Sequence, residues 1–232
     1  MNEKTAQFSL RGLFQPRDLT EGTPWKTILA FALPIIISYL LQQVYTISDA
    51  AIVGQTLTAG EVAGVNDTTS IIFIFLQFAF GVSAGFCVVT AAEVGAHHEA
   101  GVRRSLAAQI LLSAALTVLL TGLALLLLKP MLAWINVTPE SPEVYRAAHT
   151  YCAIIFAGIG AQLFYNFICS FLRSMGDSVT PLLFLLFSTI LNIGLDLLFI
   201  VSFHWGVAGA AIATVAAQLI STVGCFLYAF IK

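Results

Sequence analysis

The chain has 232 residues and a formal net charge of −2, and 59% of its residues are hydrophobic while only 9% are charged. A soluble domain usually has about a quarter of its residues charged, so this composition leaves too few polar side chains to cover a surface in water. The apolar runs are continuous and do not alternate, which excludes a transmembrane β-barrel, and no basic cluster indicates nucleic-acid binding. The sequence therefore predicts an all-α, polytopic membrane protein.

The chain begins with a polar segment of mixed charge, residues 1–25, which has no apolar core of the kind found in a signal peptide. We expect this segment to be cytoplasmic and to precede one transmembrane domain, residues 26–232. Six apolar runs in this domain are long enough to cross a bilayer, at 27–53, 62–91, 106–128, 145–171, 180–203 and 207–231. They predict a bundle of six transmembrane helices.

Lysine and arginine residues predict how the bundle lies in the membrane. With the N-terminus inside, two basic residues, Lys129 and Arg146, fall on the outer side. The other eight fall on the inner side: Lys4, Arg11, Arg17, Lys26, Arg103, Arg104, Arg173 and Lys232. Because cytoplasmic loops carry the excess of positive charge, we expect a multi-pass protein of the cell membrane with both termini in the cytoplasm.

The first span contains an aspartate, Asp49, in its outer part, and a proline, Pro34, nearer its start. Asp49 is either part of an ion site or a water-exposed carboxylate near the outer interface. Pro34 removes a backbone hydrogen bond and should kink the helix, so it is a candidate hinge or a static kink. Three other polar residues lie at membrane depth: Gln43 in this span, and Tyr165 and Asn166 in the fourth. Each of them either lines a central cavity or forms a hydrogen bond to a neighbouring helix.

The fifth span contains a second aspartate, in the stretch ILNIGLDLLFI at 190–200. Asn192 and Asp196 are four residues apart, so they share one helix face. An intramembrane carboxylate is costly and normally faces the bundle interior or a watery cavity. No lysine or arginine lies at comparable depth in the first, fifth or sixth span, so Asp196 is either a permanently protonated packing residue or part of a site for a coupling ion.

The sixth span is rich in small residues at helical spacing, in the stretch GVAGAAIATVAAQ at 206–218. Small residues let helix backbones approach closely, which would press Thr214 toward a neighbouring helix. A threonine in a helix also commonly bonds back to its own backbone, and this is the alternative role for Thr214. Two carboxylates, an amide and a hydroxyl on separate helices could supply oxygen ligands to a hard cation or share a proton.

No sequence pattern indicates catalysis or a resident cofactor. We find no nucleophile–base pair, zinc-protease motif or phosphate-binding loop, and the four cysteines lie in apolar runs without metal-binding spacing. Glu93, His97, His98 and Glu99 cluster in one loop; a solvated loop explains them, and a metal site is the less favoured alternative. We expect no enzyme, no cofactor and no metal other than Na⁺ as a coupling ion.

Several of these stretches resemble the N-terminal six-helix lobe of the multidrug and toxic compound extrusion (MATE) family, in the same order along the chain. They are LLQQVYTISDAAIVGQ, GEVAGVNDTTSIIF, GVSAGFCVVTAAEVGAHHEAGVRRS, FICSFLRSMGDSVTPLL, NIGLDLLFI and WGVAGAAIATVAAQ. The resemblance implies export of small organic, often cationic compounds in exchange for Na⁺ or H⁺. It places a cation site at Asp49, Asn192, Asp196 and Thr214, and it implies that Tyr151 and Asn166 face the same cavity.

The chain is shorter than a typical member of that family, which has twelve spans in two lobes with the drug path between them. We therefore expect a fragment or half of a transporter, whose partner is a second six-helix lobe. One rival function is a flippase for lipid-linked oligosaccharides, which should place more cationic residues in its cavity. Another is a membrane scaffold subunit, in which both aspartates should be replaceable by Asn or Leu.

Overall fold

The computed structural model describes residues 23–231, and these residues form helices without any strand. The helices are α2 (Pro24–Thr56), α3 (Ala59–Gly95), α4 (Glu99–Trp134), α5 (Pro142–Ala157), α6 (Ile159–Ser174), α7 (Val179–Asp196), the π-helix η1 (Leu197–Ser202) and α8 (Gly206–Ile231). The predicted all-α membrane fold is confirmed. The predicted cytoplasmic segment, except for its last three residues, lies outside the described residues, as does Lys232.

Five helical segments are each long and apolar enough to cross a membrane, and α5 and α6 together form a sixth. The sequence predicted one continuous span at 145–171, but the chain bends there by 45° at Gly158, which ends α5 and precedes α6. A Cβ atom at Gly158 would overlap the side chain of Val215 in α8. The bend therefore depends on close contact with another helix, which periodicity along one segment does not reveal.

The first three helices are longer than the apolar runs predicted. They have 33, 37 and 36 residues, which at 1.5 Å per residue is about 50–55 Å, against roughly 30 Å of hydrocarbon. α3 starts three residues before the predicted run because a polar cap stabilises its first turn. Thr58 Oγ1 accepts from the Glu61 N–H at 3.2 Å, and the Glu61 carboxylate accepts from the Thr58 N–H at 3.1 Å.

Pro34 lies within α2, and the helix continues through it as one element from Pro24 to Thr56. The Ser38 hydroxyl donates to the Pro34 carbonyl at 2.8 Å. The 45° bend between two consecutive helices is at Gly158. A hinge at Pro34 stays a prediction.

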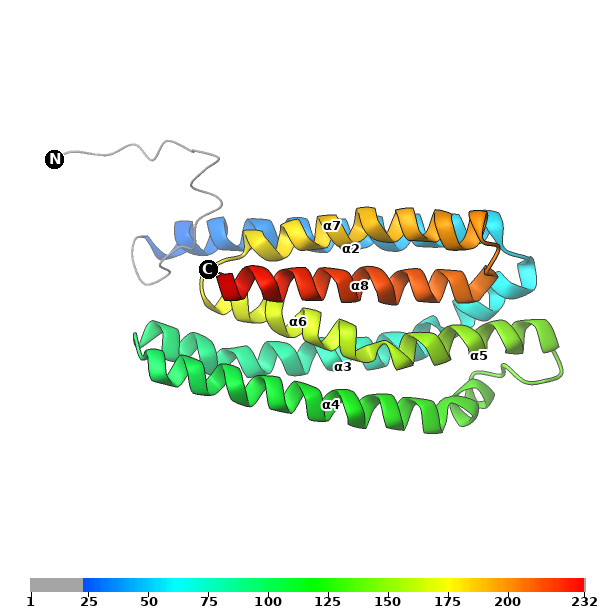
Figure 1. The fold of residues 1–232 in the computed structure, drawn as a ribbon, viewed down its shortest axis with the longest axis horizontal. Coiled ribbons are helices and arrows are strands. Elements are labelled where there is room, and N and C mark those ends of the chain that lie inside the picture. The colour runs from blue at the N-terminus through cyan, green and yellow to red at the C-terminus, as the bar shows by residue number, and fades with distance from the viewer. Residues whose placement is uncertain (1–22, 232) are drawn as a thin grey trace.

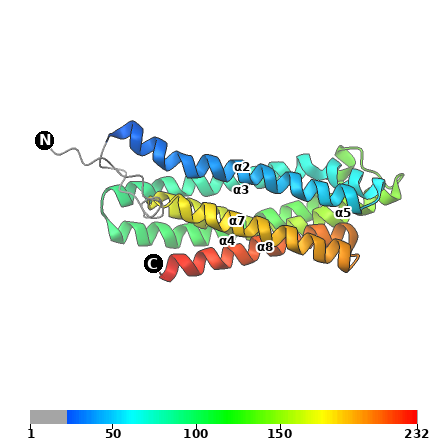
Figure 2. The same cartoon turned by 90° about the horizontal axis from the view of Figure 1, so that it is seen from above.

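The helices run roughly along one common direction and form an elongated bundle (Figures 1 and 2). We call the end where α2 begins and α8 ends the terminal end, and it also holds the α3–α4 and α6–α7 turns. We call the opposite end the distal end. α7 lies beside α8 in both views, α2 packs against α7, and α3 packs against α5 and α6.

The main core lies between α3, α4 and the α5–α6 pair. Ala124, Leu132, Ala148 and Phe156 are fully buried in it, and the Phe156 ring lies 5.0 Å from the Phe75 ring, centroid to centroid. Large apolar side chains on the outer faces of the helices are exposed instead, as a lipid-facing surface requires. The core holds one half of the bundle together, while the polar groups described next lie at the α2–α7–α8 contact.

Candidate cation site

Four helices bring the predicted site residues together in the distal half of the bundle. The carboxyl groups of Asp49 in α2 and Asp196 in α7 lie close enough to interact. The Tyr45 hydroxyl donates to Thr214 Oγ1 of α8 at 3.5 Å. Both aspartates also lie near the hydroxyl groups of Tyr45 and Tyr151. The structure thus joins α2, α5, α7 and α8 around two carboxyl groups.

Asn192 and Asp196 lie on the same face of α7, about 6 Å apart along the axis. Both side chains are 0% exposed, whereas Asp49 and Thr214 are half-buried. The predicted shared face is therefore turned into the bundle and away from lipid.

Asp196 is the last residue of α7, and the π-helix η1 begins directly after it. A π-helical turn is rare and occurs frequently at functional sites. It shifts the backbone register, so the residues beyond Asp196 do not follow the face that α7 presents. The sequence analysis did not predict this element, and hydropathy carries no signal for it.

The buried polar atoms of the site lack hydrogen-bond partners among residues 23–231. They are one oxygen of Asp49, both oxygens of Asp196, and the amide nitrogen and oxygen of Asn192. Within the same residues, no lysine, arginine or histidine lies at salt-bridge distance from either aspartate. Carboxylate, amide and hydroxyl oxygens suit a hard cation, and a pair of neighbouring carboxyl groups can also share a proton. The donor set therefore fits Na⁺ or H⁺.

The remaining predicted residues lie in different places. Tyr151 joins the site, but the Tyr165 hydroxyl donates to the Pro181 carbonyl at 3.5 Å. Pro181 precedes Asp196 by fifteen residues of α7, about 22 Å along the axis, so Tyr165 belongs to the terminal half. Asn166 follows it in α6 and is half-buried, and Gln43 is exposed on α2. A cavity-lining role for these residues stays a prediction.

Tyr45 is the residue that the predicted site omitted. It precedes Asp49 by four residues and therefore shares its helix face, and its hydroxyl contacts Thr214. The spacing of four residues could have identified Tyr45 from the sequence, because a tyrosine hydroxyl one helical turn from an intramembrane carboxylate can donate a hydrogen bond to that carboxylate.

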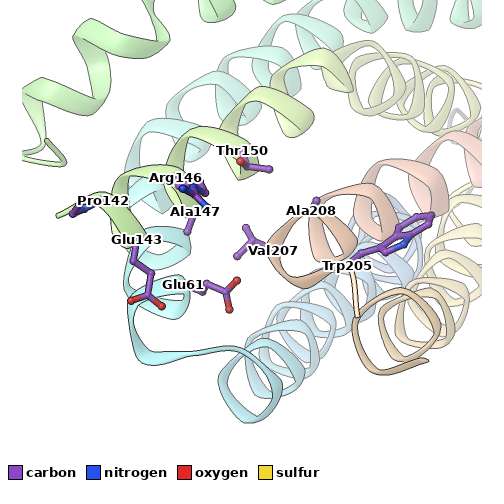
Figure 3. A pocket seen from close by; sticks show the side chains of 9 residues that line it. All are labelled: Glu61, Pro142, Glu143, Arg146, Ala147, Thr150, Trp205, Val207 and Ala208. Carbon is purple, nitrogen blue, oxygen red and sulfur yellow. The ribbon is translucent and has the colours of Figure 1, made fainter. Parts of the chain in front are cut away.

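A cavity of about 380 Å³ opens at the distal end, between the start of α3, the start of α5 and the start of α8 (Figure 3). It is lined by Glu61, Pro142, Glu143, Arg146, Ala147, Thr150, Trp205, Val207 and Ala208. Two of its lining residues, Ala147 and Val207, pack in one apolar cluster with Tyr151. Tyr151 therefore lies between the cavity and the two aspartates.

The loop with two histidines contains a pair and no larger cluster. His98 Nδ1 lies 2.8 Å from the Glu93 carboxylate. Among residues 23–231, no three histidine, cysteine, aspartate or glutamate side chains are grouped as a metal site would need.

Comparisons with known proteins agree with the fold. Residues 34–198 match the MatE protein family. The chain is 33% identical over 217 residues to the probable multidrug resistance protein YpnP of Bacillus subtilis, covering 91% of this chain and 46% of that protein. It is 27% identical over 213 residues to the probable multidrug resistance protein NorM of Thermotoga maritima, covering 89% and 44% of the two chains.

Solved structures give the same result. A transporter of the MOP superfamily from Pyrococcus furiosus superposes with a TM-score of 0.82 at 26% identity, covering 92% of this chain and 46% of that one. A multidrug resistance MATE family transporter in an outward-facing conformation superposes with a TM-score of 0.83 at 26% identity, covering 91% and 46%. The chain thus spans about half the length of the proteins that it matches.

Proposed function

The chain belongs to the MatE family, and from that premise we propose that it forms one lobe of a secondary transporter that exports small organic, often cationic compounds in exchange for Na⁺ or H⁺. The observation that carries the proposal is the pair of neighbouring carboxyl groups, Asp49 and Asp196, on two different helices. The names of the relatives support the export of drugs, and the pair supports coupling to a cation.

The pair makes the packing of α2 against α7 depend on a bound cation. When both carboxylates are ionised they repel each other in a poorly solvated place, where repulsion is stronger than in water. A proton or Na⁺ between them removes this repulsion and lets α2 approach α7. Asn192, Thr214 and the Tyr45 hydroxyl would contribute further oxygen atoms.

Movement of α2 would then link the cation to the drug. α2 packs against α7 and makes few other contacts within residues 23–231. It can therefore move with the smallest loss of packing to the other helices. A bend near Pro34 and a change at η1 would close an outward-facing drug cavity. Because linkage is reciprocal, drug binding must disfavour the cation-bound state.

A complete drug path requires a second lobe. The chain matches about half of its relatives, and we infer that a second six-helix lobe, as the other half of a longer chain or as a paired chain, forms the opposite wall. The excess of lysine and arginine at the terminal end supports an orientation with this end in the cytoplasm.

Drug accumulation in cells tests the role of the pair. The variants are Asp49→Asn and Asp196→Asn in the transporter that carries this lobe, with Asp67→Asn on α3 as the matched control because Asp67 is exposed. We expect both site variants to lose efflux while the control keeps it. Normal efflux in both site variants would overturn the proposal and would favour a scaffold role.

A further inference from the structure

Polar side chains without partners continue beyond the aspartates, along the contact between α7 and α8. Besides both polar atoms of Asn192, the amide nitrogen of Gln218 and the hydroxyl of Ser221 are buried and have no hydrogen-bond partner among residues 23–231. The Ser221 side chain is 0% exposed. A buried polar group without a partner is costly at membrane depth, so each of these groups needs a physical explanation.

One hydrogen bond sets the register between the two helices. The Ser188 hydroxyl of α7 donates to the Ala217 carbonyl of α8 at 3.5 Å. Because the helices are antiparallel and lie side by side (Figures 1 and 2), Asn192 is level with Ala213, the neighbour of Thr214. Ser221 is level with a residue one turn closer to the terminal end than Ser188.

The polar positions form one stripe on each helix. On α8, Thr214, Gln218 and Ser221 follow the spacing i, i+4, i+7, which places them on one face. Thr222, beside that face, donates to the Ala161 carbonyl of α6 at 3.1 Å. The stripe therefore lies between the side of α8 that contacts α6 and the side that contacts α7.

On α7, Asp196, Asn192 and Ser188 form the matching stripe. All three side chains are buried, with 3% or less of their surface exposed. Each stripe extends about 10–12 Å along its helix at 1.5 Å per residue, and because they are offset, the two together extend about 18 Å along the bundle axis. They connect the two aspartates with the terminal half of the lobe.

The chemistry of this column fits water. Amide and hydroxyl groups donate and accept hydrogen bonds, and a buried water typically makes about three such bonds to otherwise unpartnered groups. Asn192, Gln218 and Ser221 carry no charge themselves, so a cation would be solvated by them without being trapped. Near Cys225, one turn beyond Ser221, the opposite charges of Arg173 and Asp177 lie close by and offset each other.

We propose that the polar column of α7 and α8, defined by Asn192, Thr214, Gln218 and Ser221, holds ordered water and is the route by which the coupling cation leaves the aspartates toward the terminal end. This inference rests on the proposed function in that Asp49 and Asp196 bind the cation. It adds a release path through the lobe itself, separate from the cavity at the distal end.

Cysteine accessibility tests the column. Ser221→Cys and Gln218→Cys are introduced into the full chain with its four buried native cysteines replaced by alanine, and sealed membrane vesicles are treated with a small charged methanethiosulfonate applied at the terminal side. Leu219→Cys and Ile220→Cys are the controls, because these neighbouring side chains are 51% and 48% exposed on the apolar surface. Only a thiolate in contact with water reacts.

We expect both column cysteines to react roughly tenfold faster than both controls, since water solvates the thiolate there and lipid does not. Equal and slow reaction at all four positions would overturn the column. Size-exclusion chromatography selects the variants that fold, and Gln218→Cys carries the test if Ser221→Cys does not fold.

A second measurement separates this result from the proposed function. Thermal stability of the unsubstituted chain and of Asp196→Asn is compared with and without Na⁺ and across pH. Cation-dependent stabilisation that is lost in Asp196→Asn, together with unreactive column cysteines, would refute the column alone. Stabilisation that persists in Asp196→Asn would refute the cation site, whatever the labelling shows.

Discussion

Repulsion between Asp49 and Asp196 should be measurable as a coupling between two isosteric substitutions. Asp→Asn keeps the shape of each side chain and removes its charge. Two unit charges about 4 Å apart repel by about 4 kcal/mol at an effective dielectric constant of about 20. Asp49 is only half-buried, so water screens part of this repulsion, and we expect about 2–4 kcal/mol.

Asp49→Asn and Asp196→Asn should each remove the whole repulsion, because either charge alone has no partner to repel. In alkaline buffer without Na⁺, each single variant should therefore be more stable to unfolding than the unsubstituted chain. The double variant should gain little more than either single variant. At about 2–4 °C per kcal/mol for a chain of this size, Tm should rise by roughly 4–16 °C. In acidic or Na⁺-containing buffer the gain should shrink, because a bound cation already removes the repulsion.

The assay is thermal unfolding of the detergent-solubilised chain, with Asp67→Asn as the control for loss of a carboxylate outside the site. The coupling energy comes from the double-mutant cycle. Additive effects of the two substitutions, or single variants no more stable than the control, would show that the two carboxylates do not interact as charges.

Three further substitutions test the fold around the site. Phe156→Ala should cost about 3–5 kcal/mol of unfolding free energy, because the ring is fully buried, and chemical denaturation should show a much smaller loss for the half-exposed Phe187→Ala. Gly158→Val should cost about 1–3 kcal/mol through overlap with Val215, and Val215→Ala should restore part of the loss in Tm; no restoration would refute the close contact. Gln109→Leu should cost about 1–3 kcal/mol, since it removes the donor to the Phe86 carbonyl at 3.0 Å, and an unchanged Tm would argue against that bond.

Hydropathy predicted the number of spans because crossing a bilayer constrains every segment separately. Each helix must form its own backbone hydrogen bonds and present an apolar surface to lipid, and the length of an apolar run in the sequence indicates where both are possible. Hydropathy did not predict the bend at Gly158, because this bend depends on contact with Val215, which lies in a helix more than fifty residues later. Hydropathy did not predict the π-helix after Asp196 either, because its residues are as apolar as those of an α-helix.

The candidate site was open to prediction for a different reason. A carboxylate at membrane depth costs free energy, and this cost alone marked Asp49 and Asp196 as candidate site residues. Helical spacing then placed Asn192 on the same face as Asp196. That the two aspartates approach each other depends on the tertiary structure; the residues alone made it one possibility, and the resemblance to a known family favoured it. Tyr165 shows the limit of the same reasoning, since its polarity at depth is satisfied by the Pro181 carbonyl far from the site.

Orphaned polar atoms add information that residue types alone do not carry. Ser83 and Ser221 are both buried serines in helices, but the Ser83 hydroxyl donates to the Ala79 carbonyl at 2.9 Å. The Ser221 hydroxyl has no partner among the described residues. Only the second requires a partner beyond the described residues to complete its hydrogen bonding.

Direct cation binding tests the central claim most closely. Purified chain is equilibrated with radioactive sodium, and proton uptake is followed in the same samples with a pH indicator, for the unsubstituted chain and for the double variant Asp49→Asn/Asp196→Asn. We predict that the unsubstituted chain binds a cation, as sodium or as a proton, and that the double variant binds none at this site. Equal binding of both cations by the two proteins would contradict the account.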